Sequence, residues 1–93
     1  MIVPAYVAAL GDGRAEWMFS RSDDKSGMPT ERKLQEMWHA LRSDDPDFKC
    51  LGRSQNAVTV SLPVNCPELL RASFARAIGE AIQGGAELVH TSV

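Results

Sequence analysis

The sequence is poor in the residue types that build most metal and redox sites. It has two cysteines, Cys50 and Cys66, which form no CxxC pair and have no histidine close by in the sequence. Zinc sites are normally built from such pairs, so we expect no zinc and no other cofactor. Free thiols in a reducing cytoplasm are the expected state of both cysteines.

The sequence also lacks a strong charge of either sign and a long hydrophobic run. Ten Lys and Arg against twelve Asp and Glu give a net charge of −2, which neither attracts nucleic acid nor mimics it. The apolar start "MIVPAYVAAL" is about half as long as a membrane helix. It has no positively charged n-region and contains Pro4, so it is not a signal peptide. We therefore expect a soluble, cytoplasmic protein without a membrane partner.

What remains is the composition of an ordinary globular domain. The chain has 93 residues, of which 44% are hydrophobic and 24% charged, far from the composition of disordered chains. This length is enough for one hydrophobic core and too short for two. We expect a single domain over residues 1–93.

Alternating and apolar segments predict five strands. Residues 56–64 show the clearest alternation, because Val58, Val60 and Leu62 share one face while Thr59 and Ser61 share the other. Glycines between the first two segments indicate a hairpin turn. The strand segments are residues 2–10, 15–20, 48–53, 56–64 and 87–93.

A helical period predicts two helices. The first begins at Pro29 or Thr30 and ends before "SDDP", and its buried stripe contains Leu34, Met37, Trp38 and Leu41. The second runs from about residue 67 to the glycines at 84 and 85. Asn65 followed by Glu68 resembles a capping box at its start.

These elements give the order β-β-α-β-β-α-β. Strands with one wet face need helices on the other, so we expect an α+β two-layer sandwich with a mostly antiparallel sheet and two helices on one face. From the second strand onward the order is that of the ferredoxin-like, split βαβ arrangement, with an extra N-terminal strand. This fold serves many unrelated functions and therefore indicates none.

The polar stretch "SRSDDKSGMPT", residues 20–30, has the composition of a ligand loop. A P-loop reading fails because Asp24 precedes Lys25, where its charge would repel a phosphate. A calcium-loop reading fails because Lys25 would stand at a ligand position. We interpret the stretch as a polar connector into the first helix.

Acidic residues in two turns provide the candidate site. "DDPD" supplies Asp44, Asp45 and Asp47, and the turn between the first two strands supplies Asp12. An antiparallel sheet would place both turns at the same end of the molecule. We therefore predict an acidic end, with Asp12, Asp44, Asp45 and Asp47 as the residues that bind a partner.

No catalytic arrangement is recognisable. His39 is interpreted as a surface residue of the first helix, and His90 lies in the last strand segment; neither has a nucleophile and an orienting acid at a familiar spacing. Trp38 completes the helical stripe and should be core. Trp17 and Tyr6 could stack on a nucleic-acid base if they lay on the uncovered sheet face, with Lys49 and Arg53 as phosphate contacts.

Three function classes remain. The first is a small non-catalytic binding or regulatory module that acts through a protein partner, such as an inhibitor, an antitoxin-like protein or a phage-borne regulator. The second is a nucleic-acid-binding module that uses the open sheet face. The third is a small dimeric enzyme with a cavity between two sheets. The partner could also add a strand at a sheet edge, and the same edges would allow a homodimer.

Overall fold

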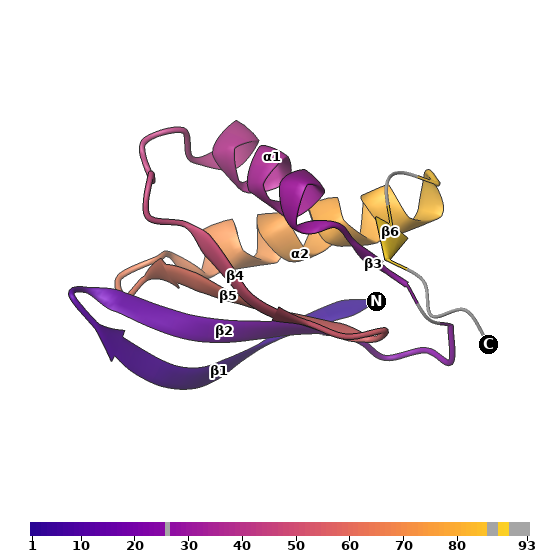
Figure 1. Cartoon of the computed structure of the whole chain (residues 1–93), viewed down its shortest axis with the longest axis horizontal. Helices are drawn as coiled ribbons and strands as arrows, with labels where there is room; N and C mark the ends of the chain where they lie inside the picture. The colour runs from indigo at the N-terminus through magenta and orange to yellow at the C-terminus, as the bar shows by residue number, and fades with distance from the viewer. Residues whose placement is uncertain (26, 86–87, 90–93) are drawn as a thin grey trace.

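The structure, a computed structural model, describes residues 1–25, 27–85 and 88–89, the last two by their backbone only. Two helices lie together on one side of a layer of strands (Figure 1). None of the helices in these ranges is long and apolar enough to span a membrane. The elements are β1 (Ile2–Gly11), β2 (Arg14–Arg21), β3 (Met28–Pro29), α1 (Glu31–Leu41), β4 (Lys49–Arg53), β5 (Ala57–Pro63), α2 (Glu68–Gln83) and β6 (Leu88–Val89).

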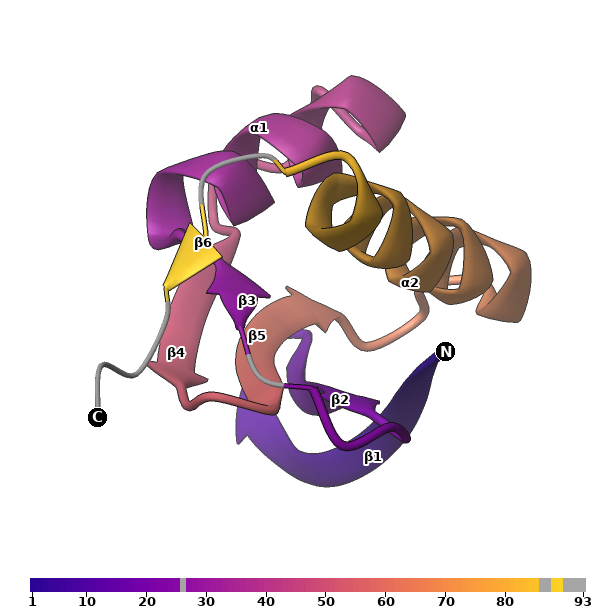
Figure 2. The ribbon, with the colours of Figure 1, turned by 90° about the vertical axis from the view of Figure 1, so that its right-hand side faces the viewer.

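The main sheet has four strands in the order β1-β2-β5-β4, and every neighbouring pair is antiparallel. The predicted α+β architecture with an antiparallel sheet and two helices is therefore confirmed. Figure 2 shows that β1 curls strongly along the lower side of the sheet and that its N-terminal end rises toward α2. The opposite face of the sheet carries no helix within the described part of the chain.

The end of the chain departs from the expected order. The described part of the predicted last strand is β6, which pairs with the short β3 in a separate two-stranded sheet. In the main sheet, β1 is instead the edge strand next to β2. β1 reaches that place because the tight turn at Gly11, Asp12 and Gly13 has positive φ at all three residues and folds β1 directly back on β2.

An aromatic cluster forms the centre of the core between the sheet and the helices. Phe74 of α2 makes edge-to-face contacts with Phe19 and Trp38, at centroid distances of 5.1 and 5.3 Å. Phe48 stacks on Trp38 at 5.9 Å. Such pairs contribute about 0.5–1.5 kcal/mol each beyond the area they bury. The predicted core role of Trp38 is confirmed, since its exposure is 0%.

The connector at residues 20–30 is only partly a polar loop. Asp23 accepts hydrogen bonds from the Lys25 backbone and the Arg21 side chain, as expected of a polar turn. The connector then enters the core, because Met28 is fully buried and Pro29 lies beside it in β3. No alternation could reveal a strand of two residues.

The two helices begin in different ways. Thr30 caps α1, as predicted, and its side chain accepts a hydrogen bond from the Lys33 backbone N–H at 3.2 Å. The predicted capping box at Asn65 and Glu68 is wrong: Pro67 is the N-cap of α2 and there is no side-chain cap hydrogen bond. Pro67 instead presets the backbone for the helix start and its carbonyl accepts from Leu70 and Arg71.

Truncation of Trp38 tests the core. Trp38→Ala should lower the free energy of unfolding by about 3–5 kcal/mol because it leaves a large cavity among Phe48 and Phe74. Chemical denaturation measures the loss. A change below about 1 kcal/mol would show that the packing of the Trp38 ring does not stabilise the core. Trp38→Phe should cost less, about 1–3 kcal/mol, because it keeps an aromatic ring but removes the indole N–H.

Candidate functional site

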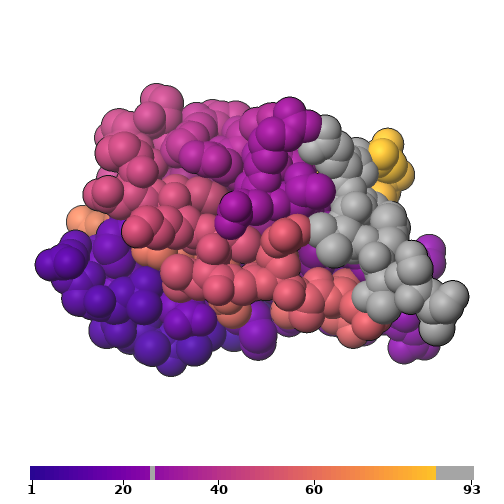
Figure 3. All heavy atoms as spheres, in the orientation of Figure 1, coloured from indigo at the N-terminus to yellow at the C-terminus, as the bar shows by residue number. Residues whose placement is uncertain are grey.

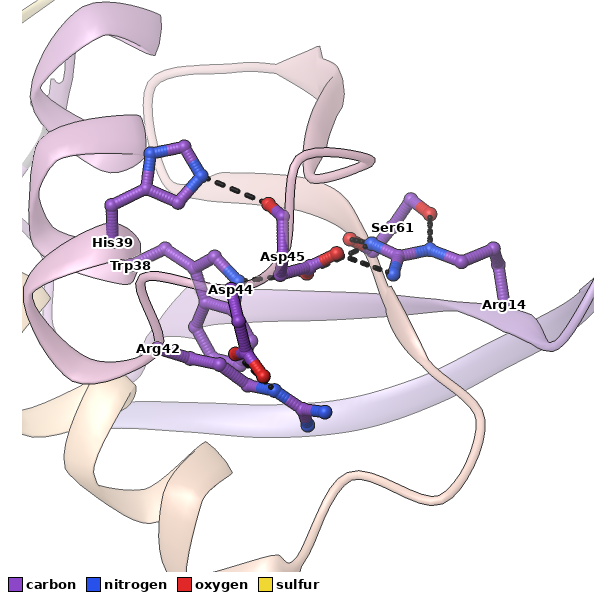
Figure 4. Close-up of polar contacts among 7 residues, drawn as sticks. All are labelled: Arg14, Trp38, His39, Arg42, Asp44, Asp45 and Ser61. Atoms are coloured by element: carbon purple, nitrogen blue, oxygen red, sulfur yellow. Dashed lines mark hydrogen bonds and ion pairs between the residues drawn. The ribbon is translucent and has the colours of Figure 1, made fainter.

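Asp45 is buried between α1 and β4 and is the centre of a hydrogen-bond network. Its exposure is 4%. The Arg14 guanidinium donates to both carboxylate oxygens, at 2.7 and 3.1 Å, and the Trp38 indole N–H donates to one of them at 2.9 Å (Figure 4). The carboxylate thus joins β2, α1 and the segment that leads into β4.

Two further residues, Ser61 and His39, extend this network. Arg14 also donates from Nε to Ser61 Oγ at 3.0 Å and from a terminal nitrogen to the Ser61 carbonyl at 2.8 Å, which ties it to β5. The imidazole of His39 donates from Nε2 to the Asp45 carbonyl at 2.9 Å. His39 is half-buried with its ring near Phe48, so the surface position predicted for it is only partly right.

The environment of Asp45 favours its ionised form. Burial by itself would raise the pKa of this carboxyl, but the hydrogen bonds from Arg14 and Trp38, together with the charge of Arg14, hold the pKa below its ordinary value of 3.8. A carboxylate with its oxygens engaged in this way is a structural acceptor. It is not placed to exchange protons with a substrate.

The structure brings only some of the four predicted site residues together at the surface. Asp12 and Asp47 line one hollow of about 350 Å³, which Leu10 and Leu51 also line. Asp44 is exposed and pairs with Arg42 at 3.2 Å. The prediction that the two acidic turns share one end of the molecule is correct, because Arg14, two residues after Asp12, bonds to Asp45.

Asp45 itself must be removed from the predicted partner surface. It is buried and neutralised by Arg14, so a partner cannot contact its carboxylate without disrupting the network. Sequence spacing gave no sign of this, since Arg14 lies 31 positions away. Removing one partner of a buried ion pair is strongly destabilising, because it leaves the other charge buried without compensation.

Exposed apolar side chains lie at the same end as the acidic residues. Figure 3 shows that the surfaces of the β1–β2 turn (indigo), of the segment after α1 (pink) and of the start of α2 (orange) adjoin there. Figure 1 places the β1–β2 turn, the C-terminal end of α1 and the start of α2 at one end of the molecule. Val64 is held there by a hydrogen bond from its N–H to the Gly13 carbonyl at 2.7 Å. We call this surface the acidic–apolar end; it consists of Asp12, Asp44 and Asp47 with Leu10, Leu41, Leu51, Val64 and Leu69, all of them exposed.

Trp17 and Tyr6 lie on the helix side of the sheet. They are paired across β1 and β2 with an edge-to-face contact at 5.7 Å, and the Arg71 guanidinium of α2 covers the Trp17 ring at 3.9 Å. The condition for base stacking on the uncovered face is therefore not met by these two residues. Lys49 pairs with Ser61 and Arg53 with Val58, so by strand alternation they point to opposite faces.

A second cavity, which the sequence patterns did not predict, lies between β1 and α2. It has a volume of about 750 Å³. The helix approaches the strand closely here, since a Cβ on Gly79 would lie 3.8 Å from Ile2. Charged side chains line it as well: Glu68, Arg71, Arg76 and Glu80. Its apolar lining comes from Ile2, Pro4, Trp17, Ala72, Ala75 and Gly79.

The two cysteines are separate free thiols. Burial is the main reason that the pKa values of Cys50 and Cys66 are raised, which makes both thiols less nucleophilic at neutral pH. Among residues 1–25, 27–85 and 88–89, no cluster of three His, Cys, Asp or Glu side chains could hold a metal ion. His90 lies outside the described residues.

Comparisons of the chain with protein-family models, curated proteins and solved structures find no match. A function can therefore be inferred only from the surfaces and contacts described above. Two of these surfaces are considered below: the acidic–apolar end and the groove between β1 and α2.

The Asp45 network predicts a loss of stability in acid. Because the folded-state pKa lies below the unfolded value, the contribution of Asp45 is complete above about pH 4 and is lost as the pH falls through the folded pKa. Denaturant titrations of the wild type should show the free energy of unfolding falling below that pH.

Asp45→Asn should make that acid-induced fall shallower and should lower stability at neutral pH by about 3–5 kcal/mol, because Arg14 loses its buried partner. Asp44→Asn, which removes an exposed carboxylate from the same segment, is the matched control and should change stability by less than about 0.5 kcal/mol. Equal effects of the two substitutions would contradict a structural role for Asp45.

Proposed function

We propose that this protein is a small non-catalytic binding or regulatory module that acts through a protein partner, in the manner of an inhibitor, an antitoxin-like protein or a phage-borne regulator. The observation that carries the proposal is the acidic–apolar end. Exposed leucines and Val64 stand there beside three exposed aspartates. Contiguous apolar side chains with a polar surround are typical of protein-binding surfaces.

The charge of the acidic–apolar end indicates which charge the partner surface should carry. Arg14 is neutralised by Asp45, and Arg42 is paired with Asp44. The other charged side chains that line the hollow are two aspartates, Asp12 and Asp47, and one lysine, Lys49. The partner surface should therefore carry lysine or arginine next to apolar side chains. Charge complementarity of this kind raises the association rate and selects the partner.

Side-chain docking fits this protein better than the addition of a strand. The outer strand β1 contains Pro4, which lacks an N–H, and its pairing is irregular at two places after Tyr6. The other outer strand, β4, has five residues and an irregularity between Cys50 and Gly52. Prolines and bulges are the features by which natural sheets prevent edge pairing, so neither edge is suited to a homodimer.

The fold and location are part of the same proposal. We infer a ferredoxin-like relationship for β2–α1–β4–β5–α2, which is supported by β5 lying between β2 and β4 in the sheet. A cytoplasmic location is supported by the two free thiols.

Affinity capture of the tagged protein from a lysate of its own host, with and without nuclease, tests the proposed function. We expect a stoichiometric protein that survives nuclease. The double substitution Asp12→Lys/Asp47→Lys should reduce its recovery at least tenfold, because it reverses the charge around the hollow without touching the buried Asp45.

Asp24→Lys is the control for that charge reversal, since Asp24 is exposed at the opposite end of β2. It should retain the partner, and circular dichroism should show the same melting temperature for all three proteins. Recovery of nuclease-sensitive material only, or of no partner at all, would contradict the proposed function. Equal loss in the control would place the contact elsewhere.

A further inference from the structure

The groove between β1 and α2 has the properties of a small-molecule site. Its volume of about 750 Å³ lies within the usual range of ligand pockets, and Ile2, Pro4 and the side chain of Trp17 contribute to its lining. The α2 wall presents Ala72, Ala75 and Gly79, whose small side chains leave the space unfilled. The groove is separate from the acidic–apolar end and does not share Asp12, Asp44 or Asp47 with it.

The two arginines determine the polar part of a ligand. Arg71 is held in place from two sides, since it stacks on Trp17 and donates to the Cys66 carbonyl. Its guanidinium has five N–H groups that lie in the guanidinium plane. Stacking on Trp17 leaves the N–H groups that do not bond to the Cys66 carbonyl available to an acceptor. Arg76 is exposed, lines the same groove and forms no ion pair with another described residue.

The acidic side chains of the groove lie toward its two ends. Glu68 and Glu80 are twelve residues apart on α2, which corresponds to about 18 Å of helix, and Arg71 and Arg76 come between them. The middle of the groove thus combines apolar lining residues with two cationic groups. Guanidinium groups recognise carboxylates through paired hydrogen bonds.

We propose that this groove binds a free small-molecule carboxylate with an apolar chain or ring. The apolar part lies against Ile2, Pro4 and Ala72, and the carboxylate accepts hydrogen bonds from Arg76 and from Arg71, which covers the Trp17 ring. This site is independent of the proposed protein partner, and either can fail without the other.

Titration of the ¹⁵N-labelled full chain with sodium octanoate, followed by NMR, tests the site. The protein contains its own reference, because Trp17 lines the groove while the Trp38 indole N–H is buried against Asp45. Octanoate should shift the Trp17 indole and the amides of Ile2, Ala72 and Gly79 in a saturable way and leave the Trp38 indole unchanged. Octanol and octylamine, of equal chain length, should bind at least tenfold more weakly.

Substitutions of single arginines test whether their charge binds the carboxylate. Arg76→Gln should weaken octanoate binding at least fivefold and leave the fold intact, because Arg76 is exposed; Arg71→Gln should weaken it at least tenfold. Arg53→Gln on β4, away from the groove, should change it less than twofold. The proposal is overturned if octanol binds as tightly as octanoate, if both groove variants bind like the wild type, or if octanoate produces no saturable shift at Trp17.

Discussion

The buried contact between Arg14 and Asp45 is the interaction on which the arrangement of this protein depends. A single carboxylate receives both arms of a guanidinium and an indole N–H, and its backbone carbonyl receives His39. Through these bonds the segment between α1 and β4 is fixed to β2, to β5 and to the end of α1. Charge-assisted hydrogen bonds of this type are short and directional, so they define the position of the segment as well as its stability.

The surface at that end of the molecule follows from this contact. Asp45 is buried, whereas Asp44 and Asp47 of the same segment are exposed. Asp47 lines a hollow together with Asp12 of the β1–β2 turn. Leu41 is exposed at the end of α1, although its spacing places it on the apolar stripe of that helix. Leu41 thereby becomes part of the acidic–apolar end, on which the proposed function depends.

Much of the fold was predictable and most of the candidate sites were not. Local periodicity located four of the strands and both helices, since burial of one face imposes a period of 2 or 3.6 on the sequence. It missed β3, because two residues show no period, and therefore also the pairing of β3 with β6. It also placed Asp45 at the surface, because nothing in the local sequence indicates a partner 31 residues away.

The sequence by itself determined an α+β architecture with an antiparallel sheet and two amphipathic helices, and it determined that Trp38 lies in the core. Those properties depend on neighbouring residues along one strand or one helix. Only the tertiary structure decided which aspartates face solvent, that Trp17 lies under Arg71, and that a groove separates β1 from α2. These features depend on contacts between side chains that are far apart in the sequence. Local sequence patterns do not determine them, because the shapes and charges of the packed layers decide which distant side chains meet.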